Sequence, residues 1–449
     1  MLINTSIKSF SSVKIEPEKV HETLSKHMLV DGFDMVVDLQ KSNGSKIWDS
    51  RNKRYFLDFF TFFASSPIGL NHPKLLTDEF KEKLLNVSIN KPTNSDVYTV
   101  EMAEFVETFS RVAIPKYLKY LFLVEGGTLG NENGLKAAFD WKIRKNFKKG
   151  YKEEKGTQVL HFTKAFHGRS GYTLSLTNTN PIKTMYYPKF KWPRITAPII
   201  EFPLNEINLE KVKKLEEQAI NEIKEAIRNN PDDIAVMIIE PIQGEGGDNH
   251  FRKEFFIELR TLCDENDIML MFDEVQTGIG LTGKMWAHQH FVQPDIMSFG
   301  KKTQVCGCLV SEKIDEVEDN VFHVSSRINS TWGGNLTDMV RFTKYLEVIE
   351  EENLVQNAEI VGKYLLEKLI ELGNEFPNKI RNIRGRGLMC AIDFNSPQER
   401  DIFKNKCYDN GIVILGCGEQ TIRFRPALNL TKEEVDEGLE IMKKVLMKM

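Results

Sequence analysis

A chain of 449 residues is too long for one ordinary hydrophobic core, so we expect one large and one smaller domain. Apolar residues make up 41% of the chain and charged residues 28%, with a net charge of −4, which argues against a protein that binds nucleic acid or an anionic membrane. Six cysteines are too sparse for a disulfide scaffold. Cys306 and Cys308 lack a second pair at zinc spacing, so we expect buried thiols and no metal site.

Two further observations concern location. No apolar stretch reaches the roughly 18–20 residues needed to cross a bilayer. The first residues, MLINTSIKSF, lack the apolar core and the cleavage site of a signal peptide, so we expect a cytoplasmic protein. The basic run from Lys142 to Lys155 is interrupted by Glu153 and Glu154, which favours a solvated helix end over a binding tail.

The middle of the chain alternates strand and helix patterns. Strands are predicted for the apolar runs at 118–124, 157–162, 234–240 and 268–274. A first helix is predicted after a glycine pair, where Leu135, Ala138, Phe139 and Ile143 have helical spacing. An amphipathic helix is predicted at 209–229, before Pro231, and another helix at 252–265. Alternating helices and apolar strands predict a parallel α/β sheet.

After residue 340 the pattern changes. Helices are predicted at 338–352 and 354–374, and Gly385 and Gly387 precede a short strand at 388–394. The last helix begins after Thr431, with Glu434 three residues on, which is the pattern of a capping box. We therefore expect a large domain at 81–337 and a small domain at 338–449, to which an N-terminal segment at 1–80 contributes.

An acid and a lysine suggest the chemistry. Asp273 ends a predicted strand, and Lys301 follows an apolar stretch and Gly300; alone, each would be read as a solvated surface residue. A pyridoxal phosphate enzyme needs an acid at the pyridine nitrogen and a lysine at the C4′ aldehyde. Because these groups lie on opposite sides of one ring, they should come from neighbouring strand ends, and a separation of 28 residues (301 − 273) suits this.

Other motifs could complete such a site. Gly126, Gly127 and Thr128 follow a strand and open a helix, where backbone N–H groups bind phosphate well. In Phe166-His167-Gly168-Arg169 the phenyl ring could stack on the cofactor and the guanidinium could pair with a carboxylate. By composition alone, core packing for Phe166 and a structural hydrogen bond for His167 are the favoured interpretations. Arg423 is a second carboxylate-binding candidate, with Arg425 as its competitor on the same strand face.

Taken together, these motifs resemble the class III, pyridoxal-phosphate-dependent aminotransferases of fold type I. The likeness spans nearly the whole chain: it runs through FLDFFTFFASSPIGLNHP at 56–73, EGGT at 125–128, FHGR at 166–169, EPIQGEGG at 240–247, FDEVQTGIGLTG at 272–283, FGKKTQVCG at 299–307, STWGGN at 330–335 and RFRPAL at 423–428. The resemblance implies an α/β fold, with a mostly parallel central sheet flanked by helices and a smaller α+β domain. It also implies a homodimer whose sites are completed across the interface.

Carried over by position, the resemblance implies that Lys301 binds the cofactor's aldehyde and that Asp273 partners its pyridine nitrogen. The remaining cofactor contacts would come from Gly127 and Thr128 at the phosphate, Phe166 on the ring, Glu240, Gln276 near the ring hydroxyl, and Thr331 of the second subunit. Lys302 competes with Lys301, which is preferred because the class pattern places the lysine directly after the small residue Gly300.

Within the class, the chain is most similar to members that pass the terminal amine of L-lysine to 2-oxoglutarate. The wordings FFASS, FGKKTQVCG and NSTWGGN carry this likeness, as does Leu281, where most relatives have arginine. Arg169 would then bind the α-carboxylate of lysine, and Arg423 would bind the α-carboxylate of glutamate or 2-oxoglutarate. Glu245 and Asn329 would also lie at the substrate. Glu245 would pair with Arg423 while lysine is bound; without the resemblance it would be read as a solvated loop carboxylate.

One departure and three alternatives remain at this point. Gly130 and Gly134 stand in the first turns of the cofactor helix, where alanine is the better helix former, so we expect a slightly looser phosphate cradle. The chain could act on another ω-amine, such as ornithine or 4-aminobutyrate. It could also be an aminomutase, which needs no keto-acid acceptor, or a non-catalytic pyridoxal-binding protein.

Overall fold

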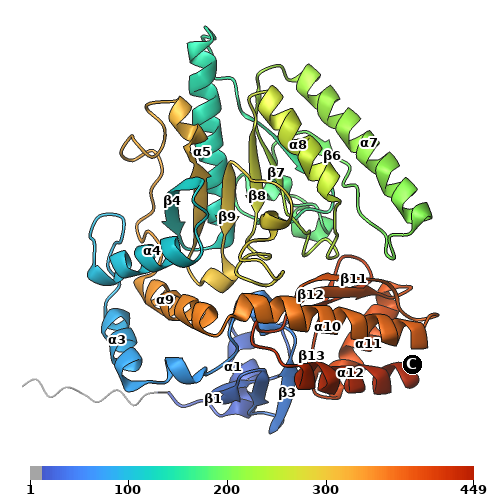
Figure 1. Ribbon diagram of the computed structural model, residues 1–449. Helices are drawn as coiled ribbons and strands as arrows, with labels where there is room; N and C mark the ends of the chain where they lie inside the picture. Colours follow the sequence, from blue (N-terminus) through green and yellow to red (C-terminus); the bar gives the residue numbers. More distant parts are fainter. Residues whose placement is uncertain (1–12) are drawn as a thin grey trace, which may run out of the picture.

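The computed structural model describes residues 13–449, so the stretch MLINTSIKSF lies outside the described residues (Figure 1). Its largest sheet has seven strands, in the spatial order β4 (Leu118–Val124), β10 (Cys306–Ser311), β9 (Ile296–Phe299), β8 (Met269–Asp273), β7 (Ile234–Ile239), β5 (Gln158–Phe162) and β6 (Arg194–Ile195). The five strands from β9 to β6 pair in parallel, and β10 is antiparallel to both β9 and β4. The expected mostly parallel α/β sheet is confirmed.

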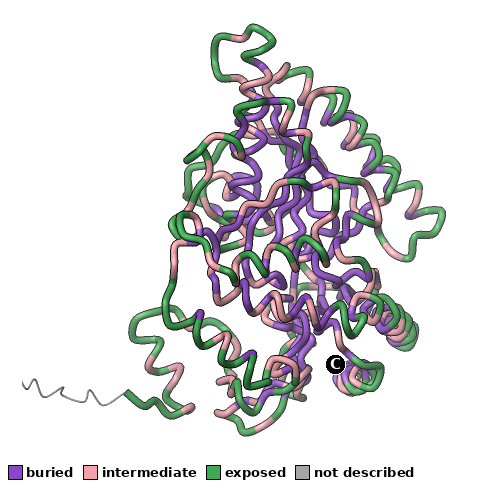
Figure 2. The backbone as a smooth tube through the Cα atoms, turned by 60° about the vertical axis from the view of Figure 1, so that its left-hand side comes forward, coloured by how far each residue is buried: buried purple, intermediate pink, exposed green. Residues whose placement is uncertain are grey.

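Helices cover both faces of this sheet, with α5 on one side and α7 and α8 on the other (Figure 1). The strand β7 shows why: all six of its residues are buried, three of them (Ala235, Val236 and Ile238) in a core under α5 and the other three in a core under α7 and α8. A strand covered on both faces needs an unbroken apolar run rather than an alternating one. Figure 2 shows the same arrangement by burial, with buried backbone in the interior and exposed backbone on the outer turns.

The helices that the sequence predicted begin and end close to the expected residues. The helices with eight residues or more are α3 (Asp78–Ile89), α4 (Val100–Val112), α5 (Gly127–Lys148), α7 (Glu206–Asn229), α8 (Lys253–Glu265), α9 (Leu336–Glu351), α10 (Leu354–Glu375), α11 (Pro397–Asp409) and α12 (Lys432–Met447). Of these, α3, α4 and α11 were not predicted. The helix α7 begins three residues early because the Asn205 side chain caps it. The capping box of Thr431 and Glu434 is present at the start of α12.

Gly130 and Gly134 of α5 lie where the helix packs against the sheet. A Cβ atom at Gly130 would lie 2.5 Å from the backbone oxygen of Gly307, and one at Gly134 would lie 2.7 Å from the Met271 side chain. These glycines let the helix sit directly on the sheet. The missing side chains thus bring α5 close to the strands, and the expectation of a slightly looser cradle stays a prediction.

Two four-stranded sheets complete the fold. One has the order β1 (Val37–Asn43), β2 (Lys46–Asp49), β3 (Arg54–Asp58) and β13 (Ile412–Val413); the other has the order β11 (Arg381–Arg386), β12 (Met389–Asp393), β15 (Thr421–Phe424) and β14 (Leu415–Cys417). Gly385 lies inside β11, a strand that the sequence did not predict, and Gly387 makes the turn to β12 with a φ of +56°. Because β3 pairs with β13, the two ends of the chain share one sheet. The domain limits at residues 80 and 337 stay a prediction.

A left-handed turn follows strand β3 of the N-terminal sheet. The four residues of α2 (Thr61–Ala64) all have positive φ, between +41° and +65°. None of them is glycine, so the turn is strained. It is held by the Asp58 carboxylate, which accepts from the N–H groups of Phe60 and Thr61, and by the Thr61 hydroxyl, which donates to the Arg425 carbonyl. Burial raises the pKa of Asp58 to about 6.

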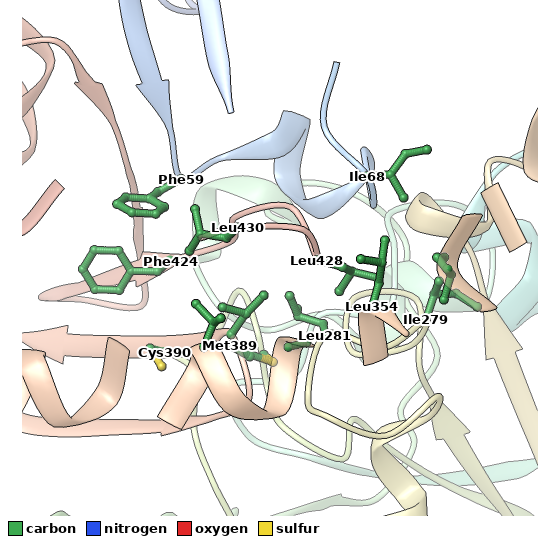
Figure 3. Packing of buried hydrophobic residues seen from close by; sticks show 14 of the residues in the cluster. Phe59, Ile68, Ile279, Leu281, Leu354, Met389, Cys390, Phe424, Leu428 and Leu430 are labelled. Carbon is green, nitrogen blue, oxygen red and sulfur yellow. The ribbon is translucent and has the colours of Figure 1, made fainter. Parts of the chain in front are cut away.

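A shared hydrophobic core joins three distant segments (Figure 3). Phe59 and Ile68 come from the N-terminal segment, Ile279 and Leu281 from the loop after β8, and the remaining labelled residues, Leu354, Met389, Cys390, Phe424, Leu428 and Leu430, from the C-terminal part. Leu281 is fully buried and its carbonyl accepts from Leu388 N–H, so an apolar residue fits this position well.

Two expectations about exposure have different outcomes. All six cysteines are buried and free, as expected. Lys142, in contrast, is not part of a solvated helix end: it is fully buried, its Nζ donates to the Asp267 carbonyl at 2.7 Å, and burial lowers its pKa to about 8. Among residues 13–449, no helix is both long and apolar enough to cross a membrane.

Candidate active site

A cavity of about 520 Å³ opens at the carboxyl ends of the parallel strands. Its wall contains most of the residues singled out in the sequence: Gly127, Thr128, Phe166, Arg169, Glu240, Glu245, Asp273, Gln276 and Lys301. They come from loops far apart in the chain that meet because ligand sites in open α/β sheets form at this edge. The sequence did not single out Asn131 and Ser170, which also line the wall.

Asp273 is fixed by two buried polar side chains. Nδ1 of His167 and Nδ2 of Asn131 each lie 2.8 Å from its Oδ2, and its Oδ1 accepts from Val275 N–H at 3.1 Å. His167 therefore makes the structural hydrogen bond that its residue type suggested. The carboxylate that it orients, that of Asp273, lines the cavity. Its Nε2 is buried without a partner among the described residues. Asn131 lies one turn into α5, and no sequence signal distinguished it from an ordinary helix residue.

Lys301 and Lys302 have opposite surroundings. Lys301 begins the 3₁₀ turn after Gly300 with a φ of +55° and lines the cavity. Burial, followed by the charges of Arg423 and Arg425, lowers its pKa to about 8 against the opposing pull of Asp273 and Glu240. Lys302 is outside the cavity wall, and its Nζ donates to the Gln276 carbonyl at 2.8 Å. Asp273 and Ser298 are paired residues of β8 and β9, so the acid and Lys301 do come from adjacent strand ends.

The start of α5 forms an anion-binding corner. The first amides of a helix have no acceptor within the helix, and they carry a partial positive charge. Gly127 has no room for a side chain, because a Cβ atom would lie 2.8 Å from the Val275 side chain. The Thr128 hydroxyl lies 2.8 Å from that of Thr173 and 3.0 Å from that of Ser170. Hydroxyl and backbone donors thus gather where a phosphate would bind.

Glu240 ties two loops of the wall together. One oxygen of its carboxyl group accepts from Phe166 N–H and the other from Gly244 N–H, each at 2.9 Å. Burial raises its pKa to about 7. Glu240 thereby positions both the Phe166 ring and the loop that carries Glu245.

Arg423 and Arg425, which the sequence could not separate, have different partners. Arg425 is fully buried, and its guanidinium pairs with both oxygens of the Asp248 carboxylate and with Gln276 Oε1. Arg423 donates to Glu245 Oε2 at 2.7 Å, and its Nε is buried without a partner among the described residues. Arg423 is therefore the arginine with donor capacity left for a carboxylate.

The remaining candidates lie at the rim or beyond it. Arg169 lines the cavity and is exposed. Asn329 and Thr331 are also exposed, but they do not line the cavity of this chain. Their loop is tied to the segment around Asn94 and Ser95, where Ser95 Oγ donates to the Ser330 carbonyl at 2.6 Å. The structure of one chain thus does not bring Asn329 and Thr331 to the other candidates.

These residues fit pyridoxal 5′-phosphate. One cavity holds an oriented acid, a lysine with a lowered pKa, an aromatic ring and an anion-binding helix start, which are the features that this cofactor needs. In the part of the chain that the structure describes, no group of three His, Cys, Asp or Glu side chains is placed to hold a metal ion.

Comparisons with known proteins agree with this geometry. The family profile described as "Aminotransferase class-III" matches residues 29–446. The protein named L-lysine-epsilon aminotransferase of Mycobacterium tuberculosis is 52% identical over 96% of both chains. A solved structure described as lysine aminotransferase from M. tuberculosis in the internal aldimine form has a TM-score of 0.95 and 52% identity, over 97% of this chain and 100% of that one. The protein named 4-aminobutyrate aminotransferase of Emericella nidulans is 32% identical, over 95% of this chain and 88% of that one.

Proposed function

The chain belongs to the class III aminotransferases, and on this premise we propose that it transfers the terminal amino group of L-lysine to 2-oxoglutarate, with pyridoxal 5′-phosphate as cofactor. The products would be L-glutamate and 2-aminoadipate 6-semialdehyde, which cyclises to a piperideine carboxylate. The observation that carries the proposal is the ion pair of Glu245, which lines the same cavity as Asp273 and Lys301, with Arg423, which is buried behind it and does not line the cavity. We also propose that the protein is located in the cytoplasm.

The relatives favour lysine over other terminal amines. Identity is 52% to a relative named for lysine and 32% to one named for 4-aminobutyrate, with similar coverage. The Glu245–Arg423 pair supports the same choice, because a free arginine would attract the α-carboxylate of lysine and place the wrong amine at the reacting position. A covering carboxylate makes this binding mode unfavourable.

The reaction needs one proton transfer that a residue of this chain can perform. When bound, pyridoxal 5′-phosphate would supply an aldehyde for the substrate's amine and a ring that withdraws electrons from the carbon bearing that amine. Asp273, held by His167 and Asn131, stabilises a proton on the ring nitrogen. The Lys301 amine would take the proton from the terminal carbon of lysine and deliver it to the C4′ carbon of the cofactor, and its pKa of about 8 suits a base at neutral pH.

Substrate orientation follows from the two arginines. Arg169, at the exposed rim, would bind the α-carboxylate of lysine and leave its far amine at the cofactor. In the second half-reaction, Arg423 would bind the α-carboxylate of 2-oxoglutarate or glutamate, with Glu245 turned aside. The unpartnered Nε of Arg423 is a donor available for this carboxylate.

We also propose that the active form is a homodimer, in which Thr331 of the second subunit contacts the cofactor phosphate and Asn329 lies near the substrate. Both residues are exposed on the single chain, and neighbouring Trp332 is 38% exposed although it is large and apolar. Exposed aromatic surface of this kind is typical of subunit interfaces.

A substrate panel tests the function. The purified holoenzyme is incubated with 2-oxoglutarate and either L-lysine, L-ornithine or 4-aminobutyrate, and the products are identified by mass spectrometry. We expect glutamate and a six-membered cyclic imine from lysine, at the highest kcat/KM of the three. A higher kcat/KM for ornithine or 4-aminobutyrate would contradict the lysine assignment. Turnover that continues without any keto acid would instead indicate an aminomutase.

A further inference from the structure

Glu245 is held by two cations, and only Arg423 was expected from the sequence. Nη2 of Arg423 lies 2.7 Å from Oε2 of Glu245, and Nζ of Lys183 lies 2.5 Å from Oε1. Lys183 ends the 3₁₀ turn η3 (Pro181–Lys183), and its Nζ also lies 5.3 Å from the ring centroid of Phe166. One carboxylate therefore bridges two positive side chains beside the cofactor cavity.

The two cations lie at different depths. The side chain of Arg423 is 2% exposed, whereas those of Lys183 and Glu245 are 23% and 28% exposed. Arg423 is thus the inner partner and Lys183 the outer one. If the carboxylate releases Arg423 and turns outward, it can keep its contact with Lys183.

The backbone around Glu245 is fixed, so only its side chain has room to turn. The Glu245 carbonyl accepts from Gly418 N–H at 2.9 Å, and Gln243 and Asn249 close the loop with a pair of backbone hydrogen bonds. A Cβ atom at Gly246 would lie 2.0 Å from the backbone oxygen of Lys164, which shows how tightly the loop packs. Rotation of the side chain about its contact with Lys183 is consistent with these constraints.

The charges also require a second cation. When a substrate carboxylate binds Arg423, two anions, the substrate's and that of Glu245, occupy the region of one buried guanidinium. With Lys183 present, two cations face two anions. Without it, Glu245 would compete with the substrate for Arg423, because like charges in a partly buried site repel strongly.

We propose that Lys183 is a positioning residue that sets substrate specificity: it holds Glu245 away from Arg423 while a dicarboxylate is bound. This inference rests on the proposed function, in which Arg423 serves 2-oxoglutarate and glutamate. Lys183 touches neither cofactor nor reacting atoms, and acts through Glu245. Its loss should impair the dicarboxylate half-reaction and largely spare the half-reaction of a substrate that leaves the Glu245–Arg423 pair closed.

The test measures each half-reaction separately, in single turnovers of the holoenzyme followed by cofactor absorbance. For Lys183→Met we expect the apparent Kd for glutamate to rise roughly 10-fold, as for the loss of one charged hydrogen bond, with the limiting rate changed less than about 3-fold. The apparent Kd for lysine should change less than about 3-fold. Lys183→Arg should restore the glutamate value, because it keeps the charge within reach of Glu245.

Two controls separate positioning from general damage. Lys189→Met alters an exposed lysine of the same segment, which donates to the Thr184 carbonyl, and should leave both half-reactions unchanged. In a Glu245→Gln background, adding Lys183→Met should cause no further rise in the Kd for glutamate. Equal losses for lysine and glutamate, or a full effect of Lys183→Met in the Glu245→Gln background, would overturn the inference.

The wild-type enzyme distinguishes this failure from failure of the proposed function. If it uses ornithine or 4-aminobutyrate instead of lysine, the lysine assignment fails. The same comparison is then made between glutamate and the accepted amine, and the prediction for Lys183→Met is unchanged.

Discussion

Lys301 and Lys302 are adjacent, yet the strand end gives them opposite environments. The positive φ of Lys301 turns its side chain into the cavity with Asp273. Lys302 is 2% exposed, it contacts the Gln276 carbonyl, and burial holds its pKa well below the ordinary value. Apart from the family resemblance, the sequence offered no physical reason to prefer Lys301 over Lys302. Which lysine enters the cavity depends on the φ angle of Lys301, and Gly300 before the pair does not determine that angle.

The first prediction concerns these two lysines. Lys301→Ala should abolish turnover and the absorbance of the lysine-linked cofactor, since among residues 13–449 no other lysine lines the cavity. Lys302→Met, which keeps the length of the side chain and removes its charge, should retain that absorbance. Both variants are compared by absorbance spectra of the cofactor-loaded proteins and by thermal melting. Loss of the lysine-linked spectrum in Lys302→Met alone would contradict the assignment.

Residue types and order predicted much of the site, but not which polar groups are already satisfied. The sequence singled out both Arg423 and Arg425, and only the contact of Arg425 with Asp248 separates them. Lys183 carried no signal beyond a basic residue after a proline. Its importance depends on packing against Glu245, 62 residues away, and one sequence contains no trace of such a contact.

At the scale of elements, the long apolar strands and amphipathic helices were predictable because their periodicity extends over many residues. The short strands β6 (Arg194–Ile195) and β13 (Ile412–Val413) were not, because two residues show no periodicity. The strand β11 was missed for another reason: its sequence, RNIRGR, is polar and only one of its residues is buried. Its pairing with β12 rather than its composition makes it a strand.

The glycines of α5 provide the prediction at this scale. Gly130→Ala should lower the melting temperature by at least about 2 °C, since the new methyl group would meet rigid backbone at Gly307 and overpacking costs about 1–3 kcal/mol. Gly134→Ala should be nearly neutral, because the flexible end of Met271 can move and alanine favours the helix by about 0.5–1 kcal/mol. Differential scanning fluorimetry measures both.

Lys136→Ala is the matched control, because Lys136 is exposed on the same helix. It should melt within about 1 °C of the wild type, as surface substitutions usually do. If Gly130→Ala were as stable as Gly134→Ala, α5 would not be limited by its approach to β10.

At the scale of the whole molecule, one chain presents an incomplete set of the expected residues. The cavity gathers the cofactor candidates, while Asn329 and Thr331 remain on the exposed loop. A sequence pattern identifies such residues without saying which subunit's site they serve. The proposed dimer resolves this by symmetry, since in a twofold dimer each chain can complete the other's site.

Mixed dimers test this arrangement. Lys301→Ala and the double variant Asn329→Ala, Thr331→Val should each have little activity alone. Co-expressed in equal amounts, they should regain about a quarter of the wild-type sites, because half of the dimers are mixed and each mixed dimer has one intact site. Mixed dimers isolated from this mixture through two different tags should have about half of the wild-type activity, because one of their two sites is intact, and their mass is measured by light scattering.

The control pair is Lys301→Ala with Asp273→Ala, two changes on the same side of the site. Mixed dimers of this pair have no intact site and should stay inactive. If the first pair regains no activity although mixed dimers are isolated, Asn329 and Thr331 do not act across an interface.

The sheet shared by the two ends of the chain has a consequence for how the protein is made. β3 pairs with β13, and the Phe59 carbonyl accepts from Arg425 N–H, so this edge of the N-terminal sheet finds its partner only after 354 further residues (412 − 58). At roughly 5–20 residues per second, the ribosome needs roughly 20–70 s for this stretch. Throughout that time β3 can pair with β2 on one side, but its other edge, which pairs with β13, has no native partner strand. Nascent chains therefore carry an open strand edge, prone to aggregation, that only the C-terminal part of the chain covers, and holdase chaperones would be most useful there.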